Sequence, residues 1–199
     1  MRKIIAINQV TLDGVMQAPG GPEEDSNGRF TEGGWAMPYW DDALADVMGH
    51  IMSGAFDLLL GRRTYDVFAG YWPQAGQDNP IAKGFNRATK FVVTNSLEKF
   101  DWVDSQPIGG DVVHALRRLK ASEGPELHMW GSHKLLQTLI AQELVDEFRV
   151  LVYPVVLGIG KRLFETGVPS RGLTLVESRT TPKGVLFASY RPAGPVPRQ

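Results

Sequence analysis

Four short segments of the chain carry side chains of the types that can bind phosphate groups. Each follows an apolar run, and their sequences are GRRTY at 61–65, TNS at 94–96, GSHK at 131–134 and GIGKR at 158–162. Glycine lets the backbone approach a ligand closely, while guanidinium, ammonium and hydroxyl groups bind phosphate oxygens. A single segment of this kind is typical of a tight turn with solvated charges. Repeated after successive apolar runs, such segments predict a dinucleotide bound along one edge of a sheet.

The first three segments supply the candidate cofactor-binding residues. They are Gly61, Arg62, Arg63, Thr64, Thr94, Asn95, Ser96, Gly131, Ser132, His133 and Lys134. In the third segment, Gly131 joins an apolar run to a predicted helix start, where free backbone N–H groups attract an anion. This arrangement suits a pyrophosphate group.

Several sharper catalytic and binding motifs are absent from the sequence. There is no G-x-G-x-x-G after the first apolar run, no G-x-x-x-x-G-K-[ST] and no G-x-S-x-G. Ser132 and His133 are adjacent on a predicted helix start, so their side chains diverge and do not form a nucleophile–base pair. The chain has no cysteine, and its 4 histidines form no H-E-x-x-H motif. We therefore expect no metal site.

The apolar pattern predicts strands that alternate with amphipathic helices. The predicted strands are residues 3–10, 56–60, 90–94, 126–130 and 147–156. Asp41, Asp111 and Ser132 are the predicted N-caps of three helices whose apolar residues recur at helical spacing. Residues 173–179 and 185–191 flank a T-T-P-K-G turn and predict an antiparallel hairpin. The sequence therefore predicts an α/β fold, with a mostly parallel central sheet flanked by helices and a C-terminal antiparallel β-hairpin.

Length and composition are those of an ordinary globular protein. With 199 residues, 43% of them hydrophobic and 22% charged, the chain predicts a single domain at 1–191 and a flexible tail at 192–199. A formal net charge of -1 and dispersed basic residues argue against nucleic acid as a partner. The start, MRKIIAI, predicts a strand rather than a signal peptide. We expect a cytoplasmic protein that acts on a small molecule and has no membrane partner.

Aromatic side chains are concentrated in two long predicted loops. They are Trp35, Tyr39, Trp40, Tyr65, Tyr71 and Trp72. The longest irregular segment, residues 17–38, has the length of a functional lid. Flat aromatic surfaces can hold a heterocycle between them, but these residues are equally suited to anchoring the loops or to a dimer contact.

The G-R-x-T segment at 61–64 resembles the cofactor segment of dihydrofolate reductases. Further segments resemble the reductase domain at the C-terminus of bifunctional riboflavin-synthesis enzymes. They are T-L-D-G at 11–14, G-S-x-x-L at 131–135, L-V-D-E at 144–147 and P-V-V-L-G-x-G-K-R-L-F at 154–164. The resemblance covers nearly all of residues 3–191, and it implies a dihydrofolate reductase-like fold.

By this resemblance the cofactor is NADPH. Arg62 and Thr64 would contact its phosphates, and residues 131–134 would cradle its pyrophosphate. Thr94 and Asn95 would lie near its adenosine end. An arginine beside a phosphate-binding turn favours NADPH over NADH. The nicotinamide would lie near the first strand, with the substrate packed opposite.

The implied activity is the reduction of a small heterocycle, similar to that of 5-amino-6-(5-phosphoribosylamino)uracil reductase in riboflavin biosynthesis. Ile7 and Gln9 stand where the riboflavin reductases usually carry a lysine and an alanine. This departure leaves two alternatives, which are dihydrofolate reductase activity and a nucleotide-binding module without turnover. Reductases of this branch commonly pair, so the resemblance also implies a homodimer.

The proton that accompanies hydride transfer needs a source. Dihydrofolate reductases use an acidic residue on the first helix, and the nearest matches here are Asp42 and Asp46. By the 3.6-residue period Asp46 lies opposite the apolar stripe, which fits either a solvated face or a face turned to a cleft. Asp13 is the alternative catalytic candidate, although its carboxylate also fits a role in capping the Asp-Gly turn.

Overall fold

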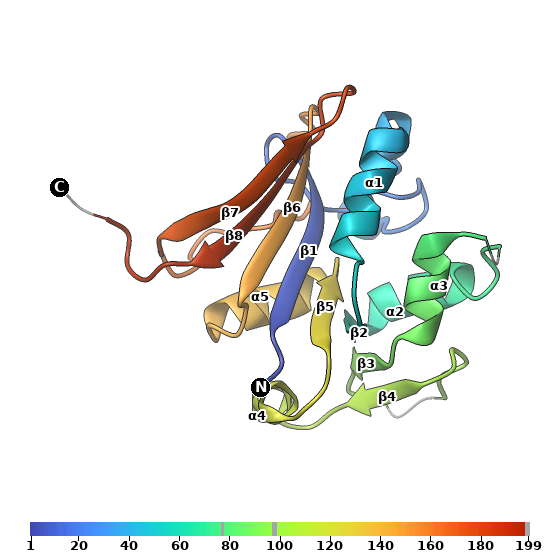
Figure 1. Cartoon of the computed structure of the whole chain (residues 1–199), viewed down its shortest axis with the longest axis vertical. Coiled ribbons are helices and arrows are strands. Elements are labelled where there is room, and N and C mark those ends of the chain that lie inside the picture. Colours follow the sequence, from blue (N-terminus) through green and yellow to red (C-terminus); the bar gives the residue numbers. More distant parts are fainter. Residues whose placement is uncertain (77, 97–98, 198–199) are drawn as a thin grey trace.

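The computed structural model describes residues 1–76, 78–96 and 99–197. Within them, an 8-stranded sheet has the order β4-β3-β2-β5-β1-β6-β8-β7 (Figure 1). Its strands are β1 (Ile4–Thr11), β2 (Phe56–Gly61), β3 (Lys90–Val93), β4 (Ser105–Ile108), β5 (Glu126–Trp130), β6 (Glu147–Tyr153), β7 (Leu173–Thr180) and β8 (Leu186–Pro192). Neighbouring strands from β4 to β6 are parallel, whereas β8 is antiparallel to both β6 and β7. The predicted parallel sheet with a C-terminal antiparallel hairpin is confirmed.

Helices cover both faces of the sheet (Figure 1). They are α1 (Asp42–Ile51), α2 (Arg62–Tyr71), α3 (Pro80–Arg87), α4 (Val112–Ala121) and α5 (His133–Ala141), with short 3-10 turns at Asn27–Arg29 and Met37–Tyr39. Residues of α1, α2 and α3 share one hydrophobic core with Ile5 and Ile7 of β1, while α4 and α5 share the other with Ile4 and Ala6. This division follows the two-residue period of a strand. Among the described residues, no helix is long and apolar enough to cross a membrane.

Strand β2 leads directly into the G-R-R-T segment at 61–64. Leu58, Leu59 and Leu60 are fully buried, as expected for a strand covered on both faces of a parallel sheet. The strand pairs in parallel with β3 and β5, so the carboxyl ends of all three lie at the same edge. Gly61 ends β2, and α2 begins at the next residue.

The sequence pattern predicts a loop where the structure has α2, and this prediction is wrong. Tyr65, Phe68 and Trp72 recur at helical spacing and pack against the core. Gly61 precedes the helix without a side-chain capping bond, so the usual signal for a helix start is missing. Tyr65 and Tyr71 therefore lie on a helix rather than in a long loop.

The C-terminal hairpin continues a short way into the predicted tail. Pro192 is the last residue of β8. Beyond it, the N–H of Ala193 donates to the carbonyl of Gly172 (2.9 Å), and the N–H of Gly172 donates to the carbonyl of Gly194 (2.8 Å). The first residues of the tail are thus held against the start of β7, while 198–199 lie outside the described residues.

A buried histidine lies in the central strand β5. The ring of His128 stacks on Phe56, with centroids 4.4 Å apart, and only 1% of the residue is exposed. Burial and the charge of Arg149 together lower the pKa of His128 to about 3, against an opposing effect of Glu147. The ring is therefore neutral, and its 3.7 Å approach to Glu126 is not an ion pair at neutral pH.

We expect His128 to make the fold sensitive to acid. In the unfolded chain the imidazole takes up a proton below about pH 6.5, whereas the folded protein resists protonation, so stability falls by up to about 1.4 kcal/mol per pH unit below that point. Urea unfolding at neutral and mildly acidic pH measures this loss, and His128→Leu should reduce it. The matched control is the exposed His114→Leu. An equal acid sensitivity in wild type and His128→Leu would contradict the assignment.

Candidate functional site

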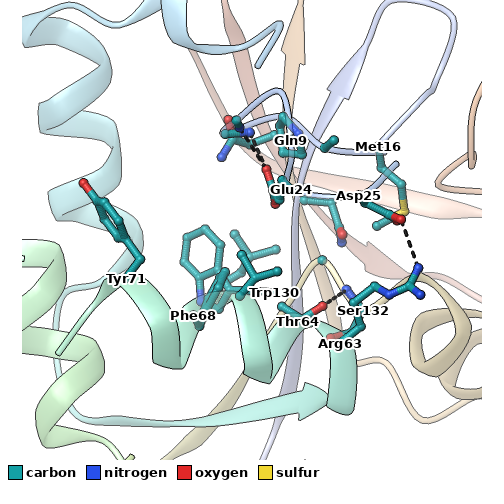
Figure 2. A pocket seen from close by; sticks show the side chains of 18 of the residues that line it. Gln9, Met16, Glu24, Asp25, Arg63, Thr64, Phe68, Tyr71, Trp130 and Ser132 are labelled. Atoms are coloured by element: carbon teal, nitrogen blue, oxygen red, sulfur yellow. Dashed lines mark hydrogen bonds and ion pairs between the residues drawn. The ribbon is translucent and has the colours of Figure 1, made fainter. Parts of the chain in front are cut away.

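A cleft of about 1650 Å³ opens at the carboxyl ends of β1, β2, β3 and β5. The segment between β1 and α1 lines it from one side, and residues of α1, α2 and α3 line it from the other. Figure 2 shows Thr64, Ser132 and Arg63 at one end and Phe68, Tyr71 and Trp130 towards the other. The cleft therefore has a polar end and an apolar end.

Two turns are tied together at the polar end. The hydroxyl of Ser132 accepts a hydrogen bond from the N–H of Gly61 (2.9 Å), and the N–H of Ser132 donates to the hydroxyl of Thr64 (3.0 Å). Gly131 has a φ of +53°, and a Cβ there would lie 3.6 Å from the Thr64 hydroxyl. These contacts hold the start of α2 and the start of α5 in a fixed relation (Figure 2).

Ser132 stands at the N-cap position of α5, as the sequence predicts, but its side chain does not cap the helix. Its backbone is left-handed, with φ 51° and ψ 51°, and its side chain makes no capping bond. The hydroxyl is used instead to join the two turns. The N–H groups at the start of α5 are thus left uncapped by Ser132, as an anion site requires.

The two hydrogen bonds that join Gly61 to Ser132 and Ser132 to Thr64 form a brace between the two turns. We expect this brace to contribute to stability and to ligand binding. Ser132→Ala removes the acceptor for the Gly61 N–H, and Thr64→Val removes the acceptor for the Ser132 N–H, each costing about 1 kcal/mol of the free energy of unfolding. Because both bonds join the same two turns, the double variant should lose less than the sum of the single losses. Urea unfolding of the three variants measures the coupling, with the exposed Ser53→Ala as control. Strict additivity would contradict the brace.

Most of the predicted cofactor residues come together here. Those that line the cleft are Gly61, Arg62, Arg63, Thr64, Thr94, Asn95, Gly131, Ser132, His133 and Lys134. Ser96 does not line it, and its hydroxyl lies 3.1 Å from that of Thr94. The sequence-predicted turns after β2, β3 and β5 therefore share one surface.

The two arginines of the G-R-R-T segment point in different directions. Arg62 donates to the carboxylate of Asp66 one helical turn later (2.8 Å), and its guanidinium lies 5.7 Å from the Phe100 ring centroid. Arg63 instead donates to Asp25, which belongs to the segment between β1 and α1 (3.0 Å). The two guanidinium groups can thus contact different parts of an elongated ligand.

Asp25 brings a negative charge to the polar end. It forms ion pairs with Arg63 and with Lys161, from the corner after β6. Burial raises the pKa of Asp25, but the bonds from Lys161 and Asn27 and the charge of Arg63 outweigh it, and the net pKa lies below its usual value. Asp25 therefore stays ionised, and an anionic ligand must compete with it for both cations.

His133 contributes little positive charge at neutral pH. Its Nε2 lies 3.0 Å from the carboxylate of Glu165, but burial lowers the pKa of His133 below its usual value. The permanent cations of the described cleft lining are Arg62, Arg63, Lys134 and Lys161. They belong to the starts of α2 and α5 and to the corner that pairs with Asp25.

The apolar end is formed by three helices and the end of β5. Its main residues are Ala45 and Met48 of α1, Met52 directly after that helix, Phe68 of α2, Phe85 of α3 and Trp130 of β5. The centroid of the Phe85 ring lies 5.4 Å from those of Phe68 and Trp130. This end is suited to a flat, apolar group.

The aromatic residues singled out from the sequence divide into two groups. Trp40, Tyr71 and Trp72 line the cleft. Trp35 does not, because it is buried and donates from Nε1 to the carbonyl of Gln17 (2.7 Å). Tyr39 and Tyr65 also lie outside the lining, with rings against Tyr153 and Phe100 respectively. Ligand contact and loop anchoring are thus divided between different residues.

The predicted catalytic carboxylates lie outside the cleft. Asp13 accepts hydrogen bonds from the Thr11 hydroxyl (2.6 Å) and the N–H of Gly158 (2.9 Å). The first of these is the main cause that lowers the pKa of Asp13 to about 2. Asp46 and Asp42 are exposed on α1, whose cleft-facing residues include Met48 and no carboxylate. The structure therefore gives no support to a catalytic role for Asp13 or Asp46.

Sequence reasoning missed other polar residues of the cleft. Glu24 and Asp25 reach it only because the segment after β1 folds back over the sheet. Asn8 and Gln9 also line it, and the Gln9 side chain accepts a hydrogen bond from Tyr153 (2.7 Å). The one available signal was the polar pair Asn8-Gln9 inside an apolar strand.

A family model described as the RibD C-terminal domain matches residues 2–187. The uncharacterized protein YyaP of Bacillus subtilis is 28% identical over 194 residues, which cover 95% of this chain and 94% of that protein.

Solved structures share the fold. A putative riboflavin biosynthesis protein from Shewanella sp. PV-4 gives a TM-score of 0.67 at 19% identity, covering 96% of this chain and 99% of that one. A pyrimidine reductase-like protein from Corynebacterium diphtheriae gives 0.63 at 12%, covering 96% and 92%. The dihydrofolate reductase of Enterococcus faecalis, complexed with NADP(H), gives 0.59 at 15%, covering 96% of each chain. The predicted dihydrofolate reductase-like fold is confirmed.

Proposed function

The chain belongs to the RibD C-terminal domain family, and on this premise we propose that it is an NADPH-dependent reductase of a small, flat heterocycle. The observation that carries the proposal is the continuous cleft, with phosphate-binding turns at one end and aromatic walls at the other. Such a cleft fits a dinucleotide lying beside a ring system. The NADP(H) complex of the Enterococcus faecalis enzyme, which shares the fold, supports this arrangement.

The residues present fit NADPH. Residues 61–64 and 131–134 would hold its phosphates, and Thr94 and Asn95 would contact the adenosine end. Nearer the centre of the cleft, the Asn8 amide and the indole N–H of Trp130 are buried and have no hydrogen-bond partner among the described residues. Buried polar groups are normally satisfied, so these atoms are suited to contact a polar ligand. When bound, NADPH would supply the hydride.

The apolar end favours an uncharged substrate. The permanent cations of the described lining belong to the polar end of the cleft. Near the start of α3, the lining carries the carboxylate of Asp78, which would repel an anionic group. A phosphate group placed among Met48, Met52 and Phe85 would lose its hydration without gaining a partner. We therefore favour a compact heterocycle without a phosphate over the phosphoribosyl substrate of the riboflavin reductases.

Cofactor binding and turnover test the proposal separately. Protein fluorescence should show saturable binding of NADPH, and weaker binding of NADH. Absorbance should then show NADPH consumption with at least one of three compounds, namely dihydrofolate, 5-amino-6-(5-phosphoribosylamino)uracil and its dephosphorylated ribosyl analogue. Binding without consumption would favour a nucleotide-binding module, and absence of NADPH binding would contradict both functions.

A further inference from the structure

We propose that Glu24 is the acid that protonates the substrate when the hydride is delivered, an inference that rests on the proposed reductase function. Glu24 lies in the segment between β1 and α1 and lines the cleft (Figure 2). It thus comes from a different element than the first helix, whose cleft-facing residues carry no carboxylate.

A short glycine-rich turn fixes the position of the Glu24 carboxyl group. Its Oε2 accepts hydrogen bonds from the N–H groups of Gly20 (2.6 Å) and Gly21 (3.2 Å), and its own N–H donates to the carbonyl of Gly21 (3.2 Å). A Cβ at residue 20 would lie only 3.1 Å from Oε2, so glycine there permits the close approach. Within the described residues Oε1 makes no hydrogen bond, which leaves it for a ligand.

A second glycine segment, Gly33-Gly34, packs against this turn. A Cβ at Gly33 would lie 2.6 Å from the carbonyl oxygen of Gly21 and 2.7 Å from that of Pro22. The N–H of Gly34 donates to the carbonyl of Ala18 (2.8 Å). The backbone around Glu24 is therefore packed in place, as a reacting group requires.

The other carboxylates of the described lining are less suited to donate a proton. Glu23 and Asp78 are exposed, while Asp25 is ionised by its two cations. No ion pair joins Glu24 to a cation in the described part of the chain. Burial raises the pKa of Glu24, with the two glycine N–H groups opposing and the Asp25 charge adding to it. Near neutral pH, a larger fraction of this carboxyl group is thus protonated than in an exposed glutamate.

Titratable groups from other elements surround this part of the cleft. They are Arg63 of α2, His133 of α5, Lys161 after β6 and Tyr153 of β6, whose hydroxyl donates to Gln9. Burial lowers the pKa of His133, so its ring is mostly neutral and holds no acidic proton to give at neutral pH. Burial raises the pKa of Tyr153, so it stays protonated over the working range. Arg63 and Lys161 are engaged by Asp25. Glu24 is therefore the group of this set suited to lose and regain a proton.

The proposed step balances atoms and charge. When bound, NADPH would supply a hydride, with its electron pair, to the carbon of a C=N bond of the substrate, which would give NADP⁺ and place the former π pair on nitrogen. That nitrogen takes the proton from the Glu24 carboxyl. The resulting carboxylate regains a proton from water, which the open cleft admits.

Replacement of Glu24 by glutamine tests this role. Glu24→Gln keeps the shape of the side chain but removes the acid, so kcat should fall by about 10²- to 10⁴-fold, with the compound that wild type reduces as substrate. The affinity for NADPH should stay within about twofold, because Glu24 has no role in phosphate binding. Glu24→Asp, which keeps an acid one methylene shorter, should retain an intermediate rate. The matched control is Glu32→Gln, at an exposed position of the same segment outside the cleft.

The pH profile distinguishes an acid from a merely structural residue. Wild-type kcat should fall as pH rises through the elevated pKa of Glu24, and Glu24→Gln should lack this limb. Full activity of Glu24→Gln, or an unchanged limb, would overturn the acid role while leaving the reductase function intact. Failure of wild type to reduce any of the three compounds would instead overturn the reductase function and the acid role together.

Discussion

Phe85→Ala should lower the free energy of unfolding by about 3–5 kcal/mol, the range for deletion of a buried phenylalanine ring. Phe85 is 1% exposed, and its ring meets Phe68, Trp72 and Trp130 at centroid distances of 5.1–5.4 Å. Urea unfolding followed by tryptophan fluorescence measures the loss.

The same variant should alter substrate binding without altering cofactor binding. Phe85 belongs to the apolar end of the cleft, so its deletion should raise the KM for the substrate and leave the affinity for NADPH unchanged. Tyr71→Ala is the matched control, since Tyr71 lines the same end but is 59% exposed. It should weaken substrate binding with little loss of stability. A stability loss below about 1 kcal/mol in Phe85→Ala would contradict its place in the core.

The sheet could be predicted because its signals are local. The run Leu58-Leu59-Leu60 has the composition of a strand buried on both faces, and the T-T-P-K-G turn predicts a hairpin. The alternation of such runs with amphipathic helices then restricts the order of connections to a parallel sheet. The edge strand β4 was harder to find, since Pro107 lies within it and Gln106 is exposed.

The missed helices show where local signals compete. α3 has an N-cap at Asn79, whose side chain accepts from the N–H of Ile81, and a proline at position 80. Its interior glycine, Gly84, weakens the helical pattern, but a Cβ there would lie 2.9 Å from the Met52 side chain. The Phe56 ring of β2 would also lie 3.2 Å from that Cβ, so close packing beside α3 favours glycine where helix propensity disfavours it. Such a tertiary requirement is invisible in a single sequence.

The candidate site divides in the same way. The candidate phosphate-binding turns directly follow strands, so the rule that ligands meet the carboxyl ends of parallel strands predicts that they share one edge, and they line one cleft there. Glu24 follows no strand, and it reaches the cleft only through the packing of Gly33 against the turn that holds it. Asp46 lies outside the cleft that the sequence left open to it. Its position opposite the apolar stripe was compatible with a cleft or with solvent, and α1 turns it to solvent.

Arg62→Ala should weaken the binding of NADPH by about 1.5–3 kcal/mol, which is the contribution of a charge-assisted hydrogen bond. This loss corresponds to an increase of about 10- to 150-fold in the Kd. NADH lacks the 2′-phosphate, so its affinity should change little. The Arg62 guanidinium is held in advance by Asp66 and by the Phe100 ring. Binding a phosphate then costs little side-chain entropy, which favours the upper part of the range. Fluorescence titration of both cofactors measures the two losses.

Arg63→Ala is the control that separates charge in general from contact with the 2′-phosphate. Arg63 points towards Asp25 rather than towards Phe100, so we expect it to serve the phosphates that both cofactors share. Its removal should weaken the binding of NADPH and of NADH by similar factors, so the ratio of the two Kd values should stay unchanged. If Arg62→Ala also weakened the two cofactors equally, Arg62 would not contact the 2′-phosphate. If Arg63→Ala alone changed the ratio, the 2′-phosphate would lie on the Asp25 side of the cleft, and the cofactor would be bound in the reverse direction along it.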